Sequence, residues 1–204
     1  MHSEILSEEQ KALLPVVKAF SKEFYLVGGT AIALHLGHRQ SIDFDLFKAG
    51  KLKRKSILNK IETFNFHTNI TRNVDDHLDV IIQGVKFTFF EYPFKIEAKQ
   101  NFDQIIKIPD LLTLAAMKAY ALGRRSKWKD YVDLYFILKE HFDFMQISQK
   151  ATSIFGDLFS EKQFRAQLSF FEDVDFTEQI DFYEDRISED SIKNFLTEVS
   201  TRLI

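Results

Sequence analysis

The spacing of apolar and polar residues differs between the two halves of this chain, and it predicts how the chain is organised. In the first half, short apolar or alternating runs predict β-strands, with runs of helical spacing between them. The predicted strands cover residues 24–27, 42–47, 65–71, 78–83 and 85–92. The predicted helices cover residues 7–20, 30–36 and 53–64. Because strands and helices mix without a regular repeat, the pattern favours an α+β fold with a mixed sheet over a doubly wound fold.

From residue 109 onward the pattern predicts almost only helices. Pro109 suits the start of a helix because its missing N–H costs little there, and Gly123 is predicted to end that helix. Ser160 with Gln163 marks a later helix start, and residues 191–203 form the last predicted helix. We therefore predict a sheet domain over residues 1–100 and a helical domain over residues 101–204, joined around residues 99–108.

Two aspartates stand at alternate positions of the predicted strand 42–47. Positions i and i+2 of a strand share a face, so Asp43 and Asp45 are expected to project together, while Ile42 and its apolar neighbours point into the core. Adjacent carboxylates repel each other, and a divalent cation such as Mg²⁺ or Mn²⁺ would compensate. The alternative is a solvated edge without a metal.

A glycine pair precedes the predicted helix 30–36. Backbone N–H groups at Gly28 and Gly29 can approach an anion closely, at the start of a helix whose dipole favours negative charge. The alternative is an ordinary turn. Ser41 shares the face of the aspartates by period 2, and Arg39 does so if the strand begins that early.

The order of glycine pair, helix and Asp-x-Asp strand resembles the nucleotidyltransferase superfamily that includes DNA polymerase β. The stretches Gly-Gly-Thr-Ala-Ile-Ala-Leu and Arg-Gln-Ser-Ile-Asp-Phe-Asp-Leu-Phe look closest to the AbiEii/AbiGii toxin group, the nucleotidyltransferase components of type IV-like toxin–antitoxin and phage-defence systems. This resemblance implies that Asp43 and Asp45 hold metal ions and that the glycine turn holds the nucleoside triphosphate. The predicted nucleotide-binding residues are Gly28, Gly29, Thr30, Arg39 and Ser41.

A second pair of segments, residues 110–120 and 129–135, also resembles this group, and the likeness spans about residues 24–138. Asp130 and Asp133 share one stripe of a predicted helix with apolar residues, where an unpaired carboxylate would cost several kcal/mol. Lys118 likewise lies among apolar residues, in the segment 110–120. One interpretation is a structural ion pair. The other has Lys118 reaching the triphosphate and Asp130 orienting it or assisting proton removal. The predicted catalytic residues are Asp43, Asp45, Lys118 and Asp130.

One departure from the resembled pattern concerns a third metal-binding acid, which related enzymes carry on a later strand. Thr88 occupies that position in the strand 85–92 and cannot supply a negative charge. Glu91 has the wrong parity unless a bulge intervenes, and Asp79 is a candidate only if the pairing register differs. Without a third acid, one metal ion would be held weakly or the enzymatic turnover would be lost.

The amino-acid composition limits the kinds of protein and of site that the chain can form. The 204 residues are 45% hydrophobic, which is ample for a packed core, and the 22 phenylalanines are expected to fill it. The absence of cysteine excludes disulfides and thiolate metal sites. No signal peptide or membrane-length apolar run is present, so we expect a cytoplasmic protein.

The net charge of −3 is a weak indication of nucleic-acid binding, but the basic residues are clustered. Such clusters are usually solvated faces, yet they could also steer a polyanion such as tRNA or another RNA. The predicted RNA-contacting residues are Lys51, Lys53, Arg54, Lys55, Arg124 and Arg125. A cognate antitoxin protein is a further candidate partner implied by the resemblance.

The sequence thus predicts a nucleotidyltransferase-like mixed sheet with flanking helices and a C-terminal helical bundle. Its predicted activity is the Mg²⁺-dependent transfer of a nucleoside monophosphate from an NTP to an acceptor hydroxyl on RNA or protein. The alternatives are a catalytically silent module that binds nucleotide or a partner, which Thr88 favours, and a metal-free α+β interaction protein.

Overall fold

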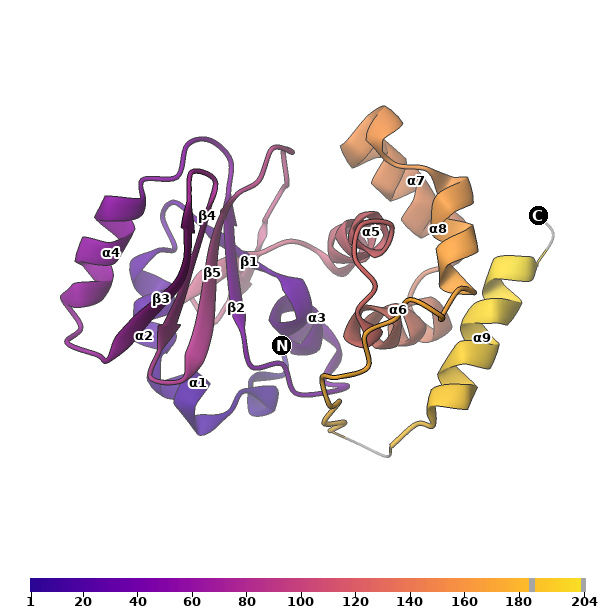
Figure 1. Cartoon of the computed structure of the whole chain (residues 1–204), viewed down its shortest axis with the longest axis horizontal. Helices are drawn as coiled ribbons and strands as arrows, with labels where there is room; N and C mark the ends of the chain where they lie inside the picture. Colours follow the sequence, from indigo (N-terminus) through magenta and orange to yellow (C-terminus); the bar gives the residue numbers. More distant parts are fainter. Residues whose placement is uncertain (184–185, 203–204) are drawn as a thin grey trace. The chain divides into compact units, whose positions relative to one another are not determined.

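A computed structural model describes residues 1–183 and 186–202 (Figure 1). Two compact units divide the chain, Met1–Asp110 and Leu111–Ile204. The sequence places the boundary earlier, at residues 100/101, because it contains no strong strand signal beyond residue 92.

The first unit contains one mixed sheet, and within the described residues the strand order is β3-β4-β5-β2-β1-β7-β6. The strands are β1 (Tyr25–Val27), β2 (Phe44–Lys48), β3 (Thr68–Val74), β4 (His77–Ile82), β5 (Val85–Glu91), β6 (Gln100–Phe102) and β7 (Ile106–Ile108). The helices are η1 (Ser3–Ile5), α1 (Glu8–Ala12), α2 (Leu14–Ala19), α3 (Gly28–Leu36) and α4 (Arg54–Glu62). The predicted α+β class with a mixed sheet is confirmed.

Strand pairing explains why the sheet is mixed. β1 pairs antiparallel with β2, β2 pairs parallel with β5, and β4 and β5 form an antiparallel hairpin. The hairpin turn has positive φ at both central residues, +48° at Gln83 and +86° at Gly84, which matches the twist of the flanking strands. This turn lies between the predicted strands 78–83 and 85–92.

One face of the sheet is the hydrophobic core of the first unit. Phe44, Phe87 and Phe89 point to this face and are fully buried. Phe20, at the end of α2, and Phe24 both pack edge-to-face on Phe89, with ring centroids 4.8 and 5.4 Å away. Each such ring contributes about 1.5–3 kcal/mol by leaving water. The opposite face of β2 and β5 is therefore left to polar and half-buried side chains.

Several boundaries differ from the sequence prediction for local reasons. The predicted helix 7–20 is divided into α1 and α2, since Pro15 in the first turn of α2 cannot continue α1. Ser7 and Gln10 form a capping box at the start of α1. β3 begins three residues later than predicted because Asn65 has φ +53° and prolongs the turn after α4.

The predicted linker at residues 99–108 is wrong. β6 and β7 form a hairpin there, and β7 joins the sheet by pairing parallel with β1. The two strands have three residues each, which is too short for a clear period-2 pattern. Their formation depends on the exposed edge of β1, which lies far away in the sequence.

The second unit is helical, with α5 (Leu111–Leu122), α6 (Trp128–Glu140), α7 (Phe144–Phe155), η2 (Gly156–Leu158), α8 (Glu161–Leu168) and α9 (Glu189–Thr201). Tyr120 of α5 stacks on Phe155 of α7, and Phe144 of α7 stacks on Phe164 of α8. The predicted helix start at Ser160 is confirmed by its bond from the Gln163 amide. Within the described residues, no helix is long and apolar enough to cross a membrane.

Candidate active site

The first cluster of the candidate site forms where β1 runs into α3, beside β2. Gly28 begins α3 with φ +72°, and a Cβ at this position would collide with the carboxylate oxygen Oδ2 of Asp45. The strand register explains the approach, since Val27 pairs with Asp45. Only glycine lets the backbone come this close to the acid. The predicted glycine turn and the second predicted aspartate therefore share one corner of the sheet.

Arg39 and Ser41 complete this corner from the loop between α3 and β2. A Cβ at Gly29 would lie 2.7 Å from Arg39 Nη2 and 2.8 Å from Ser41 Oγ. Arg39 is buried, and its Nη1 donates to the Gln40 carbonyl at 2.8 Å. A guanidinium and a hydroxyl thus stand against the first turn of α3, where the helix dipole attracts anions. The sequence predicted both residues from their proximity to the aspartates.

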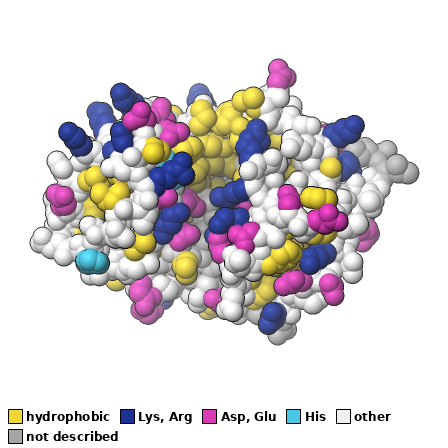
Figure 2. Space-filling view, viewed as in Figure 1, with side chains coloured by type: hydrophobic (Ala, Val, Ile, Leu, Met, Phe, Trp, Pro, Cys, Tyr) yellow, Lys and Arg dark blue, Asp and Glu magenta, His cyan; other side chains and the backbone are white. Residues whose placement is uncertain are grey.

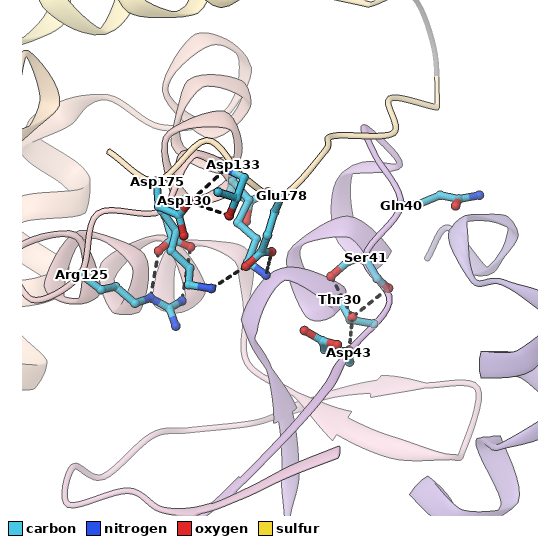
Figure 3. A network of polar contacts seen from close by, with 12 residues as sticks. Thr30, Gln40, Ser41, Asp43, Arg125, Asp130, Asp133, Asp175 and Glu178 are labelled. Atoms are coloured by element: carbon cyan, nitrogen blue, oxygen red, sulfur yellow. Dashed lines mark hydrogen bonds and ion pairs between the residues drawn. The ribbon is translucent and has the colours of Figure 1, made fainter. Parts of the chain in front are cut away.

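Thr30 holds the loop that carries these residues. Its side chain is 1% exposed, and its hydroxyl lies 3.1 Å from both the carbonyl oxygen and Oγ of Ser41 and also contacts the Asp43 carbonyl oxygen (Figure 3). Gln10 Nε2 donates to the same Ser41 carbonyl at 2.8 Å. These contacts give Thr30 a positioning role for residues 41–43. The Thr30 side chain is thus occupied within the protein, and phosphate binding in this helix turn would fall to the backbone amides of the half-buried Gly28 and Gly29.

The two aspartates differ in whether their backbone belongs to the sheet. β2 begins at Phe44, so Asp45 belongs to the ladder and Asp43 directly precedes it. The prediction that Ile42 points into the core is wrong, because Ile42 is 64% exposed. Side-chain alternation requires a paired strand, and residue 42 lies before the pairing starts. Phe44 is fully buried as predicted, and both aspartates are half-buried.

Thr88 lies directly opposite Asp45 in the parallel pair of β2 and β5, as the predicted register requires. Asp79 lies opposite Thr88 in the neighbouring hairpin. Glu91 has the other parity, and its Oε2 accepts a hydrogen bond from the Leu52 amide at 3.2 Å. On the Asp45 face, β5 therefore offers a hydroxyl at this position.

Oxygen donors dominate this corner, and they fit a magnesium ion. Mg²⁺ is commonly held by one or two carboxylates together with phosphate oxygens of a substrate. Asp43 and Asp45 would supply the carboxylates, and both side chains are half-buried beside the glycine turn. Among the described residues there is no group of three or more His, Cys, Asp or Glu that could hold a metal ion. A cation here would depend on ligands from the nucleotide.

The second cluster lies within the helical unit and is buried. Lys118 of α5 is 4% exposed, and its Nζ lies 2.5 Å from Asp130 Oδ1 and 2.9 Å from Asp133 Oδ2, both on α6. Arg125 adds two contacts to Asp130, from Nε at 3.0 Å and from Nη2 at 3.3 Å (Figure 3). The predicted stripe of acids and the predicted lysine are thus brought together. Within the helical unit, the Lys118 ammonium is thus shared by both acids.

Electrostatics agree with a tight ion-pair network. Burial by itself would raise the pKa of Asp130, but Lys118 and Arg125 more than offset it and hold that pKa below its usual value. Asp133 opposes this effect as a neighbouring negative charge. Asp130 is therefore a carboxylate at neutral pH, which is the state that can share a proton donor with Asp133.

Comparison with known proteins decides the family. A profile described as nucleotidyl transferase AbiEii toxin, type IV TA system, matches residues 13–200. The chain belongs to the AbiEii family. An uncharacterized protein of Aquifex aeolicus strain VF5 is 34% identical over 139 residues, which are 66% of this chain and 67% of that protein.

Solved structures share the AbiEii fold at low identity. The nucleotidyltransferase toxin MenT4 of Mycobacterium tuberculosis superposes with a TM-score of 0.64 at 13% identity, covering 94% of this chain and 81% of that one. JHP933 of Helicobacter pylori gives a TM-score of 0.56 at 16% identity, covering 96% and 91%. At these identities the likeness shows the nucleotidyltransferase fold alone.

The basic clusters predicted to contact RNA are partly neutralised in this AbiEii chain. Arg54 is bound by Asp75 Oδ1 at 2.8 Å and Asn73 Oδ1 at 2.6 Å, beside a groove that also exposes Lys53 and Lys55. Arg124 stacks over the Tyr120 ring and donates to the Leu158 carbonyl. Figure 2 likewise shows acidic side chains interspersed with basic ones on the visible face. RNA contact by these residues stays a prediction.

Two acids that the sequence did not single out as partners complete the picture. Glu178 binds both Lys127 and Lys129 at 2.5 Å, so it supplies a counter-charge to two lysines that closely follow Arg124 and Arg125 in the sequence. Asp79 of β4 contacts His77 on the same strand and Lys86 on β5. The pairing of His77 with Asp79 follows strand spacing, because the two residues stand at i and i+2 of β4, whereas the pairing of Glu178 with Lys127 and Lys129 follows no local period.

Proposed function

We propose that this AbiEii chain transfers a nucleoside monophosphate from an NTP to an acceptor hydroxyl on RNA or protein, with Mg²⁺ as cofactor. The supporting observation is the corner in which Gly28 accommodates the Asp45 carboxylate at the start of α3. A helix terminus that attracts phosphate and a carboxylate that attracts a cation are adjacent there. Membership of a nucleotidyltransferase toxin family supports the same reaction and a cognate antitoxin as partner.

The residues of the corner would bind either the phosphates or the cation, according to their charge. The backbone amides of Gly28 and Gly29, with Arg39 and Ser41 beside them, would receive the phosphates of the NTP. Asp43 and Asp45 would hold the cation. When bound, Mg²⁺ stabilises the attacking and leaving oxygens of an in-line displacement. The acceptor hydroxyl would lose its proton to solvent, its oxygen would bond to the α-phosphorus, and the bond from that phosphorus to the departing pyrophosphate would break.

Lys118 and Asp130 are assigned a structural role in this proposal. The sequence favoured a phosphate-binding Lys118 with Asp130 as its helper, which requires an ammonium group directed at the ligand. Support for the structural alternative comes from the two carboxylates that share the Lys118 ammonium at 2.5 and 2.9 Å. The stability experiment described in the Discussion separates the two roles.

A catalytically silent nucleotide-binding module is the second candidate function. It is favoured by Thr88, which stands opposite Asp45 where a further carboxylate would strengthen metal binding. Such a module would bind NTP with a divalent cation and would transfer nothing. The two functions share the binding step and differ only in product formation.

The deciding experiment combines binding and transfer. Calorimetry with each of the four NTPs in the presence of Mn²⁺ measures binding by the wild type and by Asp43→Asn. Incubation with α-³²P-labelled NTPs, Mg²⁺ and total RNA and protein measures transfer. We expect the wild type to bind and to label one class of acceptor, and Asp43→Asn to lose both.

Asp103→Asn is the matched control, because Asp103 is exposed in the β6–β7 turn and its φ of +44° suits asparagine. This variant should behave as the wild type in both assays. Binding without labelling would support the silent module. Undiminished binding by Asp43→Asn would remove the metal site from this corner.

A further inference from the structure

Three polar side chains form a straight row across the sheet of the first unit. Asp45 of β2, Thr88 of β5 and Asp79 of β4 are directly opposite one another in register. Directly paired residues point to the same face, and neighbouring strands lie about 4.8 Å apart. Asp45 and Asp79 are therefore about two strand spacings apart, with the Thr88 hydroxyl between them.

Asp79 is fully engaged at its own end of the row. His77 Nε2 lies 2.8 Å from Oδ1, and Lys86 Nζ lies 3.5 Å from Oδ2. The Thr88 hydroxyl is a third partner. Burial by itself would raise the pKa of Asp79, but these partners outweigh it and lower the pKa. The contacts with His77 and Lys86 favour the carboxylate form of Asp79, which can only accept hydrogen bonds.

The direction of the Thr88–Asp79 bond follows from this charge state. Because an ionised carboxylate has no proton to give, the Thr88 hydroxyl must donate to it. A hydroxyl has one proton and two lone pairs, so its acceptor side remains for a partner other than Asp79. Thr88 is itself buried, and its neighbour on the other side of the row is Asp45.

We propose that Asp79 and Thr88 act as one unit toward the cation held at Asp45, with Thr88 supplying an oxygen directly or through one water and Asp79 fixing the direction of its hydroxyl. This inference rests on the proposed function. Asp79 is a positioning residue in this arrangement. Groups that orient the ligands of a metal commonly change its affinity by 10–100-fold.

A purely structural role for the row makes a different prediction. A buried carboxylate with three partners would stabilise the β4–β5 hairpin whether or not a cation binds at β2. Its loss would then lower the melting temperature and leave the affinity for metal and nucleotide unchanged. Binding measurements therefore separate the two roles, and they require no knowledge of the acceptor.

The test uses the full chain and calorimetric titration of each of the four NTPs in the presence of Mn²⁺. Thr88→Val removes the hydroxyl at nearly constant shape, and we expect about 10-fold weaker binding. Thr88→Ser keeps the hydroxyl and should stay within about 3-fold of the wild type. Thr68→Val, on the exposed strand β3, is the matched control and should change nothing.

A double-mutant cycle tests whether Asp79 acts through Thr88. Asp79→Asn should also weaken binding about 10-fold, and the Asp79→Asn/Thr88→Val double variant should be no weaker than Thr88→Val alone. Full additivity would show that Asp79 acts independently and would overturn its role.

The remaining outcomes are equally clear. Unchanged binding by Thr88→Val beside a loss in Asp43→Asn would overturn the inference and leave the proposed function standing. Absence of Mn²⁺-dependent NTP binding in the wild type would overturn both. Melting temperatures of all variants, measured in parallel, identify any loss of binding that comes from unfolding.

Discussion

Replacing Lys118 by methionine is the sharpest test of the buried network in the helical unit. Methionine keeps the length of the aliphatic chain and removes the ammonium that lies 2.5 Å from Asp130 and 2.9 Å from Asp133. Both carboxylates have no exposed side-chain surface, so water cannot replace the lost charge without structural change. The substitution therefore exchanges a balanced network for one with excess buried negative charge.

Breaking a buried pair by removing one partner costs about 3–5 kcal/mol. Arg125 remains beside Asp130 and is half-exposed, which limits what it can compensate. For a chain of this size, each kcal/mol lowers the melting temperature by about 2–4 °C, so we expect a drop of about 6–20 °C. Nucleotide binding at the Gly28–Asp45 corner should be unchanged below that temperature.

The single tryptophan makes the assay specific. Trp128 is buried in the first turn of α6, two residues before Asp130, so its fluorescence follows the helix that carries both acids. Urea unfolding monitored at Trp128 gives the free energy of unfolding. Lys129→Met is the matched control, because Lys129 loses only a partly exposed pair with Glu178. We expect that control to cost at most about 1 kcal/mol.

A second substitution should partly restore the stability lost with Lys118. Lys118→Met combined with Asp133→Asn removes one buried negative charge, so the double variant should recover part of the lost stability. A Lys118→Met protein that unfolds within about 1 kcal/mol of the wild type yet no longer binds NTP would refute the structural role. It would instead support the phosphate-binding role that the sequence favoured.

Two further predictions concern single residues. Gly28→Ala should lower the free energy of unfolding by about 1–3 kcal/mol and abolish Mn²⁺-dependent NTP binding, because a Cβ would collide with Asp45. Gly50→Ala is its control, since Gly50 also has a positive φ, +76°, but has open space around it. This control should show only the backbone strain in thermal melts and should keep NTP binding. Because the pKa of Asp130 is lowered in the folded chain, its stabilising contribution is complete above the unfolded pKa of about 3.9 and is lost as pH falls through the folded value. Urea unfolding at pH 3–7 should therefore show a smaller loss of stability on acidification for Asp130→Asn than for the wild type, and equal slopes would contradict the ion-pair assignment.

Local features of the fold could be predicted because they depend on neighbours in the sequence. The capping box at Ser7, the tight turn at Gly84 and the parity of Thr88 all follow from short-range geometry. The same holds for the glycine turn that precedes the Asp-x-Asp segment. These patterns predict the candidate corner, and the family that they resemble is the one whose profile matches residues 13–200.

Long-range pairing decided the rest. β7 exists because β1 offers an open edge, and the first strand residue, Phe44, determines that Ile42 faces solvent. Hydrogen-bond partners of this kind lie many residues away, and periodicity within one segment contains no information about them. The sequence therefore determined which side chains carry the candidate chemistry. Only the tertiary structure decided that Lys118 is shared by two carboxylates and that Thr88 stands between two others.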